Sequence, residues 1–519
     1  MTAVAAPQAV WPDRAAFGAF AQGHGMVPVT RTLVADTETP IGVYRKLAAG
    51  RPDTFLLESA EPGRSFSRWS FVGVHARAVL TSDGTDAVWR GDPPPGVPVD
   101  GDPLQALAAA WRALRSPSAP ELPPLTGGLV GYLGYDVVRR LEPLPGAAVD
   151  DLGLPELTMM LTTDLAAVDS FECRVVLIAN AIVSADTDLD AAYDDAIARL
   201  DRMTADLARA VPSAPATLAQ VEPKAATSRT PPGEYERTVE RAIEAIRAGE
   251  VFQILPGQRF EAQTTADPFD IYRVLRTLNP SPYLFFLRLP GLDVVGSSPE
   301  ALVTVRDGEA TIHPLAGTRR RGATAAEDEA MVTELVNDPK ERAEHVMLVD
   351  LARNDLGRVC TPGTVRVTQF GAVERYSHVW HIVSTVSGDV ADGRDAFDVF
   401  VSAFPHGTVT GAPKVRAMQL IDELEPVRRG VYGGAVGYFG AAGDMDLAIA
   451  IRTAVVRDGT AYVQASAGVV ADSRPDLEAL ETRNKARALL QAIATAETLR
   501  PVDAPPAQPS SGPSPEPQP

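Results

Sequence analysis

The stretch Val431–Val469 reads VYGGAVGYFGAAGDMDLAIAIRTAVVRDGTAYVQASAGV and decides the class of fold. It contains three apolar runs, Val431–Phe439, Leu447–Arg457 and Ala461–Val469, which are joined by short segments of Gly and Asp. Short apolar runs bounded by such turn residues are typical of consecutive antiparallel strands. Arg452 lies inside the second run, and a lone cation within a strand must be paired or bind a ligand.

The same strand pattern continues upstream of this stretch. Alternation in Ala301–Arg306 and Glu309–His313 around Asp307-Gly308 predicts a hairpin. Arg174–Ile178 and Val251–Arg259 also have the pattern of strands. Helical spacing of apolar residues predicts helices over Leu189–Ala210, Tyr235–Ala248, Glu327–Asp355 and Asp476–Thr498. Because hairpins rather than helical crossovers join most strands, we expect an α+β fold with antiparallel sheets.

Length and composition limit the class of protein. The chain has 519 residues, so we expect two domains or one large composite domain. The formal net charge of −19 would repel nucleic-acid backbones and anionic lipids, and we exclude both as partners. No stretch stays apolar for the roughly 18 residues of a membrane helix, and Met1–Gln22 lacks the pattern of a signal peptide. The two cysteines, Cys173 and Cys360, fit a reducing cytoplasm.

Three segments are predicted to be connectors. Asp92–Pro98 is rich in Pro and Gly, and Val211–Pro232 has no periodic apolar pattern. Pro501–Pro519 is rich in Pro and Ser. We therefore divide the chain into an N-terminal region (1–210), a linker (211–232), a C-terminal region (233–498) and a disordered tail (499–519).

Two pairs of carboxylates stand at helical spacing. Glu341 and Glu344 share one helix face, and Glu478 and Glu481 share another, with Lys485 one turn further on. Two such faces could converge on Mg²⁺, which prefers oxygen ligands. Two solvated acidic faces would give the same pattern, so spacing alone leaves both interpretations open.

Other polar residues suggest an anion site. Gly317-Thr318 comes before Arg319–Arg321, and a Gly-Thr turn offers a backbone N–H and a hydroxyl to an anion. Gly407-Thr408, Gly411 and Lys414 would allow the backbone to approach a carboxylate closely. The alternatives to an anion site are an ordinary turn at Gly317-Thr318 and a plain loop at Gly407–Lys414.

The sequence lacks the residues needed for two functions, glutamine hydrolysis and dinucleotide binding. Cys173 and Cys360 are not flanked by the small residues expected around a glutaminase nucleophile, so this chain should not hydrolyse glutamine itself. No GxGxxG opens a helix after a strand, which argues against a dinucleotide cofactor. His381, in the strand-like run Val379–Ser384, could be either a structural histidine or a catalyst.

Four long motifs resemble those of chorismate-utilising enzymes, and anthranilate synthase component I is the most similar branch. They are Gly296–Glu300, Asp338–Arg358, Phe404–Lys414 and Arg429–Tyr438. The resemblance extends from about residue 30 to residue 498. It implies large, mostly antiparallel sheets in a sandwich with helices packed outside. It also implies chorismate as the substrate, Mg²⁺ as the cofactor and anthranilate as the product.

The resemblance also assigns roles to single residues. Glu344 and Glu481 match metal ligands, and Glu341 and Glu478 match supporting carboxylates. The catalytic positions are Glu300, His381, Gln253 and Thr408. The substrate-binding positions are Gly317, Thr318, Tyr432, Arg452, Ser466, Ala467, Gly468 and Lys485. By this resemblance, Glu300 protonates the departing C4 hydroxyl, His381 takes part in pyruvate elimination, and Arg452 holds the enolpyruvyl carboxylate.

Two positions select the branch of the family. Isochorismate- and salicylate-forming relatives have a lysine where this chain has Gln253, and a glutamine cannot activate water. The aminodeoxychorismate branch has a lysine where this chain has Ala316. The alternatives are a 2-amino-2-deoxyisochorismate synthase, against which His381 argues, and a non-catalytic regulatory paralogue, against which the intact acidic set argues.

A feedback site for L-tryptophan is implied by two further segments, Leu56–Ser59 and Asn279–Leu284. Ser59, Pro282, Tyr283 and Leu284 would line it. The family often has methionine where this chain has Leu284, and His406 and Leu315 replace a small residue and an isoleucine. The resemblance further implies a glutamine amidotransferase subunit that supplies ammonia, and therefore a hetero-oligomer in the cytoplasm.

Overall fold

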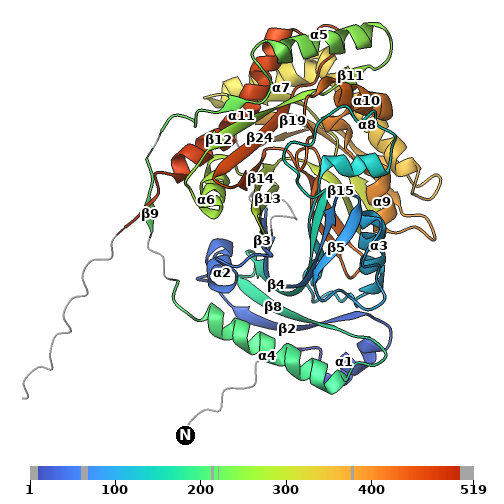
Figure 1. Ribbon diagram of the computed structural model, residues 1–519, viewed down its shortest axis with the longest axis vertical. Helices are drawn as coiled ribbons and strands as arrows, with labels where there is room; N and C mark the ends of the chain where they lie inside the picture. Colours follow the sequence, from blue (N-terminus) through green and yellow to red (C-terminus); the bar gives the residue numbers. More distant parts are fainter. Residues whose placement is uncertain (1–9, 60–67, 212–214, 220, 376–378, 503–519) are drawn as a thin grey trace, which may run out of the picture.

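A computed structural model describes residues 10–59, 68–211, 215–219, 221–375 and 379–502. Most of its strands join one large sheet whose pairings are antiparallel. Figure 1 shows the helices on the outside of this sheet, with α4 (Leu189–Leu207) across one end and α5 (Glu234–Arg247) at the other. The α+β class predicted from the hairpins is therefore confirmed.

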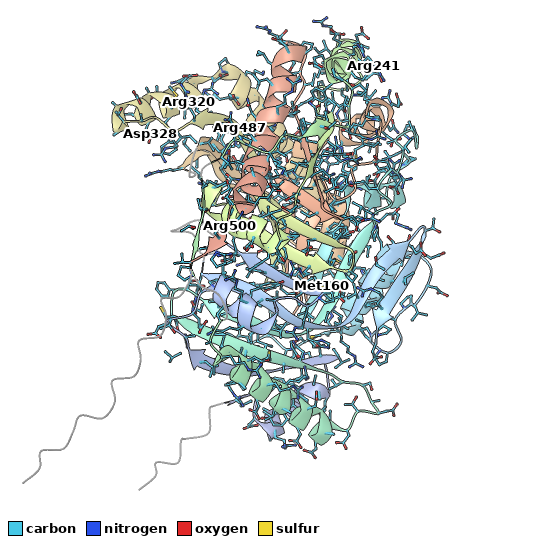
Figure 2. The ribbon with its side chains drawn as sticks, turned by 60° about the vertical axis from the view of Figure 1, so that its left-hand side comes forward. Met160, Arg241, Arg320, Asp328, Arg487 and Arg500 are labelled. Carbon is cyan, nitrogen blue, oxygen red and sulfur yellow. The ribbon has the colours of Figure 1, made fainter. Side chains whose placement is uncertain are left out.

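The described N-terminal part contributes strands and four α-helices. The helices are α1 (Arg14–Ala21), α2 (Pro40–Leu47) and α3 (Pro103–Ala113), besides α4. The strands are β1 (Val10–Trp11), β2 (Met26–Val34), β3 (Thr54–Glu58), β4 (Trp69–Asp83), β5 (Asp86–Gly91), β6 (Gly128–Leu133), β7 (Leu157–Asp169) and β8 (Arg174–Ile182). Figure 2 shows Met160 of β7 inside the molecule, and its side chain is fully buried.

The C-terminal part adds the remaining strands and helices. The strands of the large sheet are β10 (Thr227–Ser228), β12 (Gly257–Gln263), β13 (Tyr283–Leu289), β14 (Leu292–Ser298), β15 (Ala301–Arg306), β16 (Glu309–Ile312), β17 (Leu315–Arg320), β18 (Arg366–Arg375), β19 (Val379–Asp389), β21 (Ala435–Gly440), β22 (Met445–Ile449), β23 (Thr453–Arg457) and β24 (Thr460–Ser466). The helices are α5, α6 (Pro268–Leu278), α7 (Ala325–Asn337), α8 (Pro339–Gly357), α9 (Ala396–Ala403), α10 (Lys414–Leu424) and α11 (Pro475–Ala496).

Strands from the two parts pair directly with each other. β3 pairs with β13, and β6 pairs with β21. Within the predicted linker, β10 pairs with β12 and β9 (Ala216–Thr217) pairs with β25 (Arg500–Pro501). Residues 503–519 of the predicted tail lie outside the described residues.

The core also crosses between the two parts. Tyr44 of α2 stacks on Phe269 of α6 with ring centroids 4.6 Å apart, and both contact Phe286 of β13. A second cluster consists almost entirely of strand residues, among them Phe55, Tyr132 and Phe285. Sheet faces that pack on each other in this way form the interior of a sandwich.

Four sequence-based boundaries were wrong. The predicted helix Glu327–Asp355 is two helices, because Pro339 starts α8 and Asp338 caps it by accepting from the N–H groups of Lys340 and Glu341 at 2.9 and 3.2 Å. The predicted strand Val251–Arg259 is divided by Pro256 into β11 (Gln253–Ile254) and β12.

The stretch Val431–Val469 folds as four strands rather than three. The run Leu447–Arg457 is divided into β22 and β23 by Arg452, which has a φ of 50° in the left-handed region. The strand predicted over Val431–Phe439 begins only at Ala435, after a turn. The hairpin at Asp307-Gly308 is confirmed, with Arg306 opposite Glu309. Among the described helices, none combines the length and the apolar character needed to cross a membrane.

Candidate active site

Glu300 lies in the short connection between β14 and β15, and only 5% of its surface is exposed. Burial raises the pKa of its carboxyl to about 8, although hydrogen bonds from the Thr408 hydroxyl and the Leu315 backbone lower it. Its Oε1 is buried and has no hydrogen-bond partner within the described chain. A carboxyl group in this state is protonated at neutral pH and can act as a general acid.

The loop Phe404–Lys414 brings Thr408 to this carboxyl. Its short 3₁₀ helix, η3 (Gly407–Val409), presents the Thr408 hydroxyl, which donates to Glu300 Oε2 at 3.2 Å. Gly407 packs against Leu351 of α8, where an added Cβ would lie 2.1 Å from Leu351 Cδ2. A side chain at this position would therefore displace the end of Leu351.

His381 lies on β19 and is 9% exposed. Its Nδ1 donates to the carbonyl oxygen of Gly317 at 2.9 Å. Burial lowers the pKa of His381 to about 4; the Gly317 carbonyl opposes this shift and the charge of Arg452 adds to it. Because a carbonyl only accepts, the neutral ring carries its proton on Nδ1 and its basic nitrogen is Nε2.

Gly317 lies close to several predicted site residues. It has a φ of 65°, at a bulge in β17 where the register with β19 shifts, so the predicted Gly-Thr turn is instead a bulged strand. An added Cβ would lie 2.9 Å from Leu335 and 3.3 Å from Glu341 Oε2. The backbone of Thr318 pairs with that of His381, whereas the Thr318 side chain lies outside the described part of the structure.

Arg452 faces the same region from the break between β22 and β23. Within the described residues, its guanidinium has no hydrogen-bond or ion-pair partner. Burial lowers its pKa, and the nearby Tyr432 and Glu481 raise it. Because Arg452 also lowers the pKa of His381, these groups lie within electrostatic reach of one another. An unpaired, half-buried guanidinium fits a carboxylate ligand.

A hydrogen-bonded group adjoins Arg452. The Tyr432 hydroxyl lies 2.7 Å from Ser466 Oγ, and Lys485 of α11 donates to the Ser466 carbonyl at 2.9 Å. Lys485 also pairs with Glu481 at 2.6 Å. The structure therefore brings these four predicted residues together at the end of β24, and Ala467 and Gly468 follow directly.

The two acidic helix faces of α8 and α11 approach each other. Burial raises the pKa of Glu344 and that of Glu478, and Lys340 and Lys485 lower both. The two carboxylates, on different helices, therefore lie within reach of the same two ammonium groups. The alternative of two separate solvated faces does not hold for Glu344 and Glu478, although Glu481 is exposed.

Gln253 adjoins this acidic region. Its amide donates to Glu344 Oε1 at 2.9 Å, and an added Cβ at Gly468 would lie 3.1 Å from the same amide nitrogen. Arg319 pairs with Glu341 at 2.9 Å. No group of three or more His, Cys, Asp or Glu in the described chain forms a preassembled metal site. One or two carboxylates are enough for Mg²⁺ when substrate oxygens and water complete its shell, so the residues present fit that ion.

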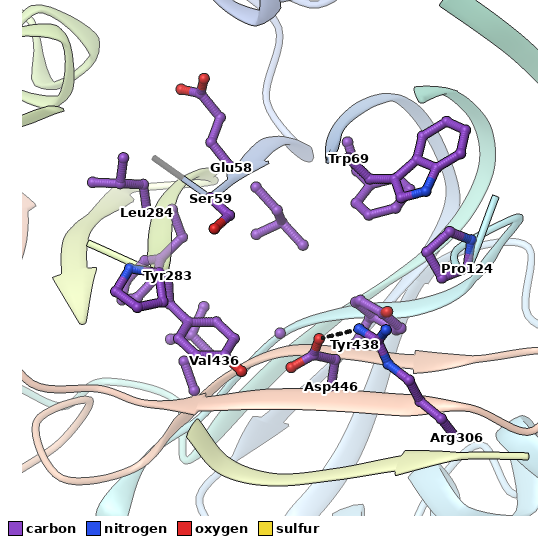
Figure 3. A pocket seen from close by; sticks show the side chains of 16 residues that line it. Glu58, Ser59, Trp69, Pro124, Tyr283, Leu284, Arg306, Val436, Tyr438 and Asp446 are labelled. Atoms are coloured by element: carbon purple, nitrogen blue, oxygen red, sulfur yellow. Dashed lines mark hydrogen bonds and ion pairs between the residues drawn. The ribbon is translucent and has the colours of Figure 1, made fainter. Parts of the chain in front are cut away.

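A separate pocket of about 650 Å³, including the space at its mouth, lies between the two parts of the chain. Ser59, Pro282, Tyr283 and Leu284 all line it, as Figure 3 shows for three of them. The pairing of β3 with β13 sets Leu284 opposite Glu58 and so joins the two sequence segments. The Ser59 hydroxyl is buried without a hydrogen-bond partner within the described residues.

Two charged residues are among the lining residues of this pocket that were not predicted from the sequence. Arg306 and Asp446 pair at 3.2 Å on its floor, below Tyr438 (Figure 3). Both also line a second pocket of about 1250 Å³, which Glu300 borders. Asp446 stands in the otherwise apolar run Met445–Ile449, and a carboxylate at such a position is the signal that could have identified it.

Comparisons with known proteins agree with these observations. Residues 52–491 match the family of chorismate binding enzymes. Anthranilate synthase component 1 of Mycobacterium tuberculosis is 57% identical over 498 residues, which cover 94% of this chain and 96% of the relative. The corresponding protein of Arthrobacter globiformis is 50% identical, with 94% of each chain covered.

Solved structures show the same fold. Anthranilate synthase component I from Streptococcus pneumoniae TIGR4 superposes with a TM-score of 0.72 at 33% identity, covering 88% of this chain and 98% of that one. The menaquinone-specific isochorismate synthase MenF of Escherichia coli, at 19% identity, has a TM-score of 0.67 over 91% of this chain and 95% of its own. The chain therefore belongs to the chorismate-binding enzymes and, within them, to the anthranilate synthase component 1 proteins.

Proposed function

We propose that this chain converts chorismate and ammonia into anthranilate and pyruvate in tryptophan biosynthesis. The main support is one arrangement of three side chains. Glu300 is held protonated, His381 is held neutral, and Arg452 offers a guanidinium that none of the described residues pairs with, within electrostatic reach of His381. The reaction needs a proton donor, a proton acceptor and a carboxylate anchor, and these three residues supply them.

Each residue has a step in the proposed reaction. Arg452 binds a carboxylate of chorismate, and Tyr432 and Lys485 border that position. Glu300 donates its proton to the C4 hydroxyl, which leaves as water when ammonia adds at C2. Nε2 of His381 then takes the C2 proton while the enolpyruvyl group gains a proton and departs as pyruvate. General acid–base groups of this kind contribute typically about 10²–10⁴-fold each.

The branch of the family rests on two positions. The Gln253 amide donates to Glu344 and carries no basic nitrogen, so it does not generate hydroxide from water. Ala316 on β17 leaves no lysine for a covalent route. Ammonia is therefore the nucleophile we propose, supplied by a glutamine amidotransferase subunit in a cytoplasmic hetero-oligomer.

The test of the reaction is product identification by mass. The purified chain, supplied with chorismate, Mg²⁺ and an ammonium salt, should form anthranilate and pyruvate in equal amounts. An aminated product that keeps its enolpyruvyl group would show the 2-amino-2-deoxyisochorismate reaction instead. No product would contradict both proposals.

We further propose that Glu344 and Glu481 hold Mg²⁺, with Glu341 and Glu478 as supporting carboxylates. When bound, this ion would neutralise the ring carboxylate of chorismate. Glu344→Gln and Glu481→Gln should each weaken Mn²⁺ binding, followed by electron paramagnetic resonance, by about tenfold or more. The matched control is Glu244→Gln on the exposed face of α5, which should leave Mn²⁺ binding unchanged. Equal Mn²⁺ affinity in all three variants contradicts the site.

The pocket that contains Ser59 is our proposed site for L-tryptophan as a feedback inhibitor. Its apolar lining suits an indole ring. The buried Ser59 hydroxyl, which has no partner among the described residues, offers a hydrogen bond to an amino acid.

A further inference from the structure

Three side chains meet at the candidate acid: the buried His406, the half-buried Thr408 and Glu300 itself. His406 Nδ1 lies 2.8 Å from the Thr408 hydroxyl oxygen, which in turn lies 3.2 Å from Glu300 Oε2. His406 Nδ1 is also 3.8 Å from Glu300 Oε1. His406 and Glu300 are each 5% exposed. The imidazole and the carboxyl are therefore largely shielded from bulk water.

The tautomer of His406 follows from its contacts. Its Nδ1 caps η3 by accepting from the backbone N–H of Thr408 at 3.3 Å, so Nδ1 carries no proton. Burial and, to a smaller extent, the charge of Lys414 lower the pKa of His406 to about 3. Nδ1 is therefore a permanent acceptor at neutral pH.

The Thr408 hydroxyl has one hydrogen and two acceptors within reach. Glu300 Oε2 is the more distant one at 3.2 Å, and His406 Nδ1 is the nearer one at 2.8 Å. When the hydrogen points to His406, the Thr408 oxygen can only accept, and it can then bond to Glu300 only if Glu300 is protonated. When the hydrogen points to Glu300, it stabilises the carboxylate.

We propose that His406 is a positioning residue that competes with the Glu300 carboxylate for the hydrogen of the Thr408 hydroxyl and so favours the proton-donating form of Glu300. The inference rests on the proposed role of Glu300 as the acid of the reaction. It adds a residue that acts on Glu300 through the hydroxyl of Thr408.

Few other groups can influence this carboxyl. The other charged or titratable residues that line the pocket beside Glu300 are Tyr283, Arg306, His313, Glu374 and Asp446. None of them is among the causes that shift the pKa of Glu300, and Lys414 acts on His406. The Thr408 hydroxyl and the Leu315 backbone are the two hydrogen-bonding groups that stabilise the charged form.

The test is the pH profile of kcat for anthranilate formation with ammonium as the nitrogen source. His406→Leu has a similar volume and no acceptor, so the Thr408 hydrogen should turn to Glu300. The upper limb of the profile should then move down by about one pH unit, the effect of one redirected hydrogen bond. His406→Asn keeps an acceptor oxygen and should leave the limb at its wild-type position.

A double-mutant cycle isolates the route through Thr408. In a Thr408→Val background, His406→Leu should cause no further shift, because the competing hydrogen is gone. An equal shift in both backgrounds, or no shift in His406→Leu alone, overturns the inference. If the leucine variant does not fold by circular dichroism, His406→Ala, which also lacks an acceptor, takes its place with the same expectation.

The same assays separate this inference from the proposed function. A wild-type protein that makes no anthranilate contradicts the function itself. A wild-type protein that makes anthranilate, with pH profiles that coincide for all His406 variants, contradicts only the role of His406.

Discussion

The pKa values of Glu300 and His381 are displaced in opposite directions. Burial raises that of the carboxyl to about 8 and lowers that of the imidazole to about 4. At neutral pH the acid therefore keeps its proton and the histidine lacks its second one, the reverse of their usual order in water. Environments that move two titratable groups apart in this way assign one as the proton donor and the other as the acceptor.

The first prediction concerns pH. Glu300 acts in its protonated form, which is present below its pKa of about 8 and lost above it. We expect kcat to fall as the pH rises through about 8, and Glu300→Gln to lower kcat by about 10²–10⁴-fold. Stopped assays of anthranilate fluorescence measure both. Glu309→Gln, which removes a half-buried carboxylate of β16, is the control and should keep wild-type kcat.

The second prediction concerns Arg452. Arg452→Lys keeps the charge but loses the planar fork that binds a carboxylate through two hydrogen bonds. We expect the KM for chorismate to rise about tenfold, as for the loss of one charge-assisted hydrogen bond. Arg457→Lys, at the other end of β23, should leave KM unchanged. An Arg452→Lys protein with the wild-type KM would falsify the assignment of Arg452 as the carboxylate anchor.

Among the elements, β22 and β23 show what the sequence could not provide. Every neighbour of Arg452 in the run Leu447–Arg457 suits a strand, and no Gly or Pro marks the break. The left-handed φ of 50° at Arg452 is set by tertiary contacts, such as the hydrogen bond from the Ser297 N–H to the Arg452 carbonyl at 3.1 Å. Local pattern carries no information on such contacts. The division between α7 and α8, in contrast, could have been predicted, because Asp338-Pro339 is a typical helix start.

Some features of the candidate site could likewise be predicted from the sequence, and others could not. Helical spacing was enough to pair Glu341 with Glu344 and Glu478 with Glu481. The family motifs then identified the other candidate residues of the site. Spacing could not reveal that Gln253 donates to Glu344, because residues far apart in sequence meet there. Nor could it show that His406 contacts Thr408, because that depends on the turn of η3.

The third prediction concerns β6, the strand that joins the two parts of the sheet. Gly131 lies opposite Gly437 of β21 and Met159 of β7, and an added Cβ would lie 1.9 Å from the Thr158 carbonyl oxygen. We expect Gly131→Ala to destabilise the protein by about 3 kcal/mol or more, since the backbone must move. Gly18→Ala in α1 meets no atom within 4 Å and should stabilise it by about 0.5–1 kcal/mol. Urea unfolding curves compare the two variants.

At the scale of the whole molecule, two pockets share a wall. Tyr283, Arg306 and Asp446 line both the proposed tryptophan pocket and the pocket beside Glu300. β15 begins next to Glu300 and ends at Arg306, while β22 carries Asp446 opposite Thr304. A ligand that moves the Arg306–Asp446 pair would thus act on the strand that positions the acid.

The fourth prediction follows from this shared wall. L-Tryptophan and a non-reactive chorismate analogue should each weaken the binding of the other by the same factor in calorimetry, because coupling between sites is reciprocal. Ser59→Ala should weaken tryptophan binding about five- to tenfold while kcat without tryptophan is unchanged. Ser184→Ala, in an exposed turn, is the control. Tryptophan affinity that does not respond to the analogue, or to the loss of the Ser59 hydroxyl, contradicts the site.

Because β3 pairs with β13 and β6 pairs with β21, the gene could be divided into two parts whose products depend on each other. A chain cut between residues 221 and 226 would yield two fragments, each with open strand edges that only the other can close. Expressed separately, both should aggregate. Expressed together in one cell, they should assemble by mutual strand pairing and restore catalysis, so this enzyme could serve as a split reporter whose signal is the fluorescence of its own product.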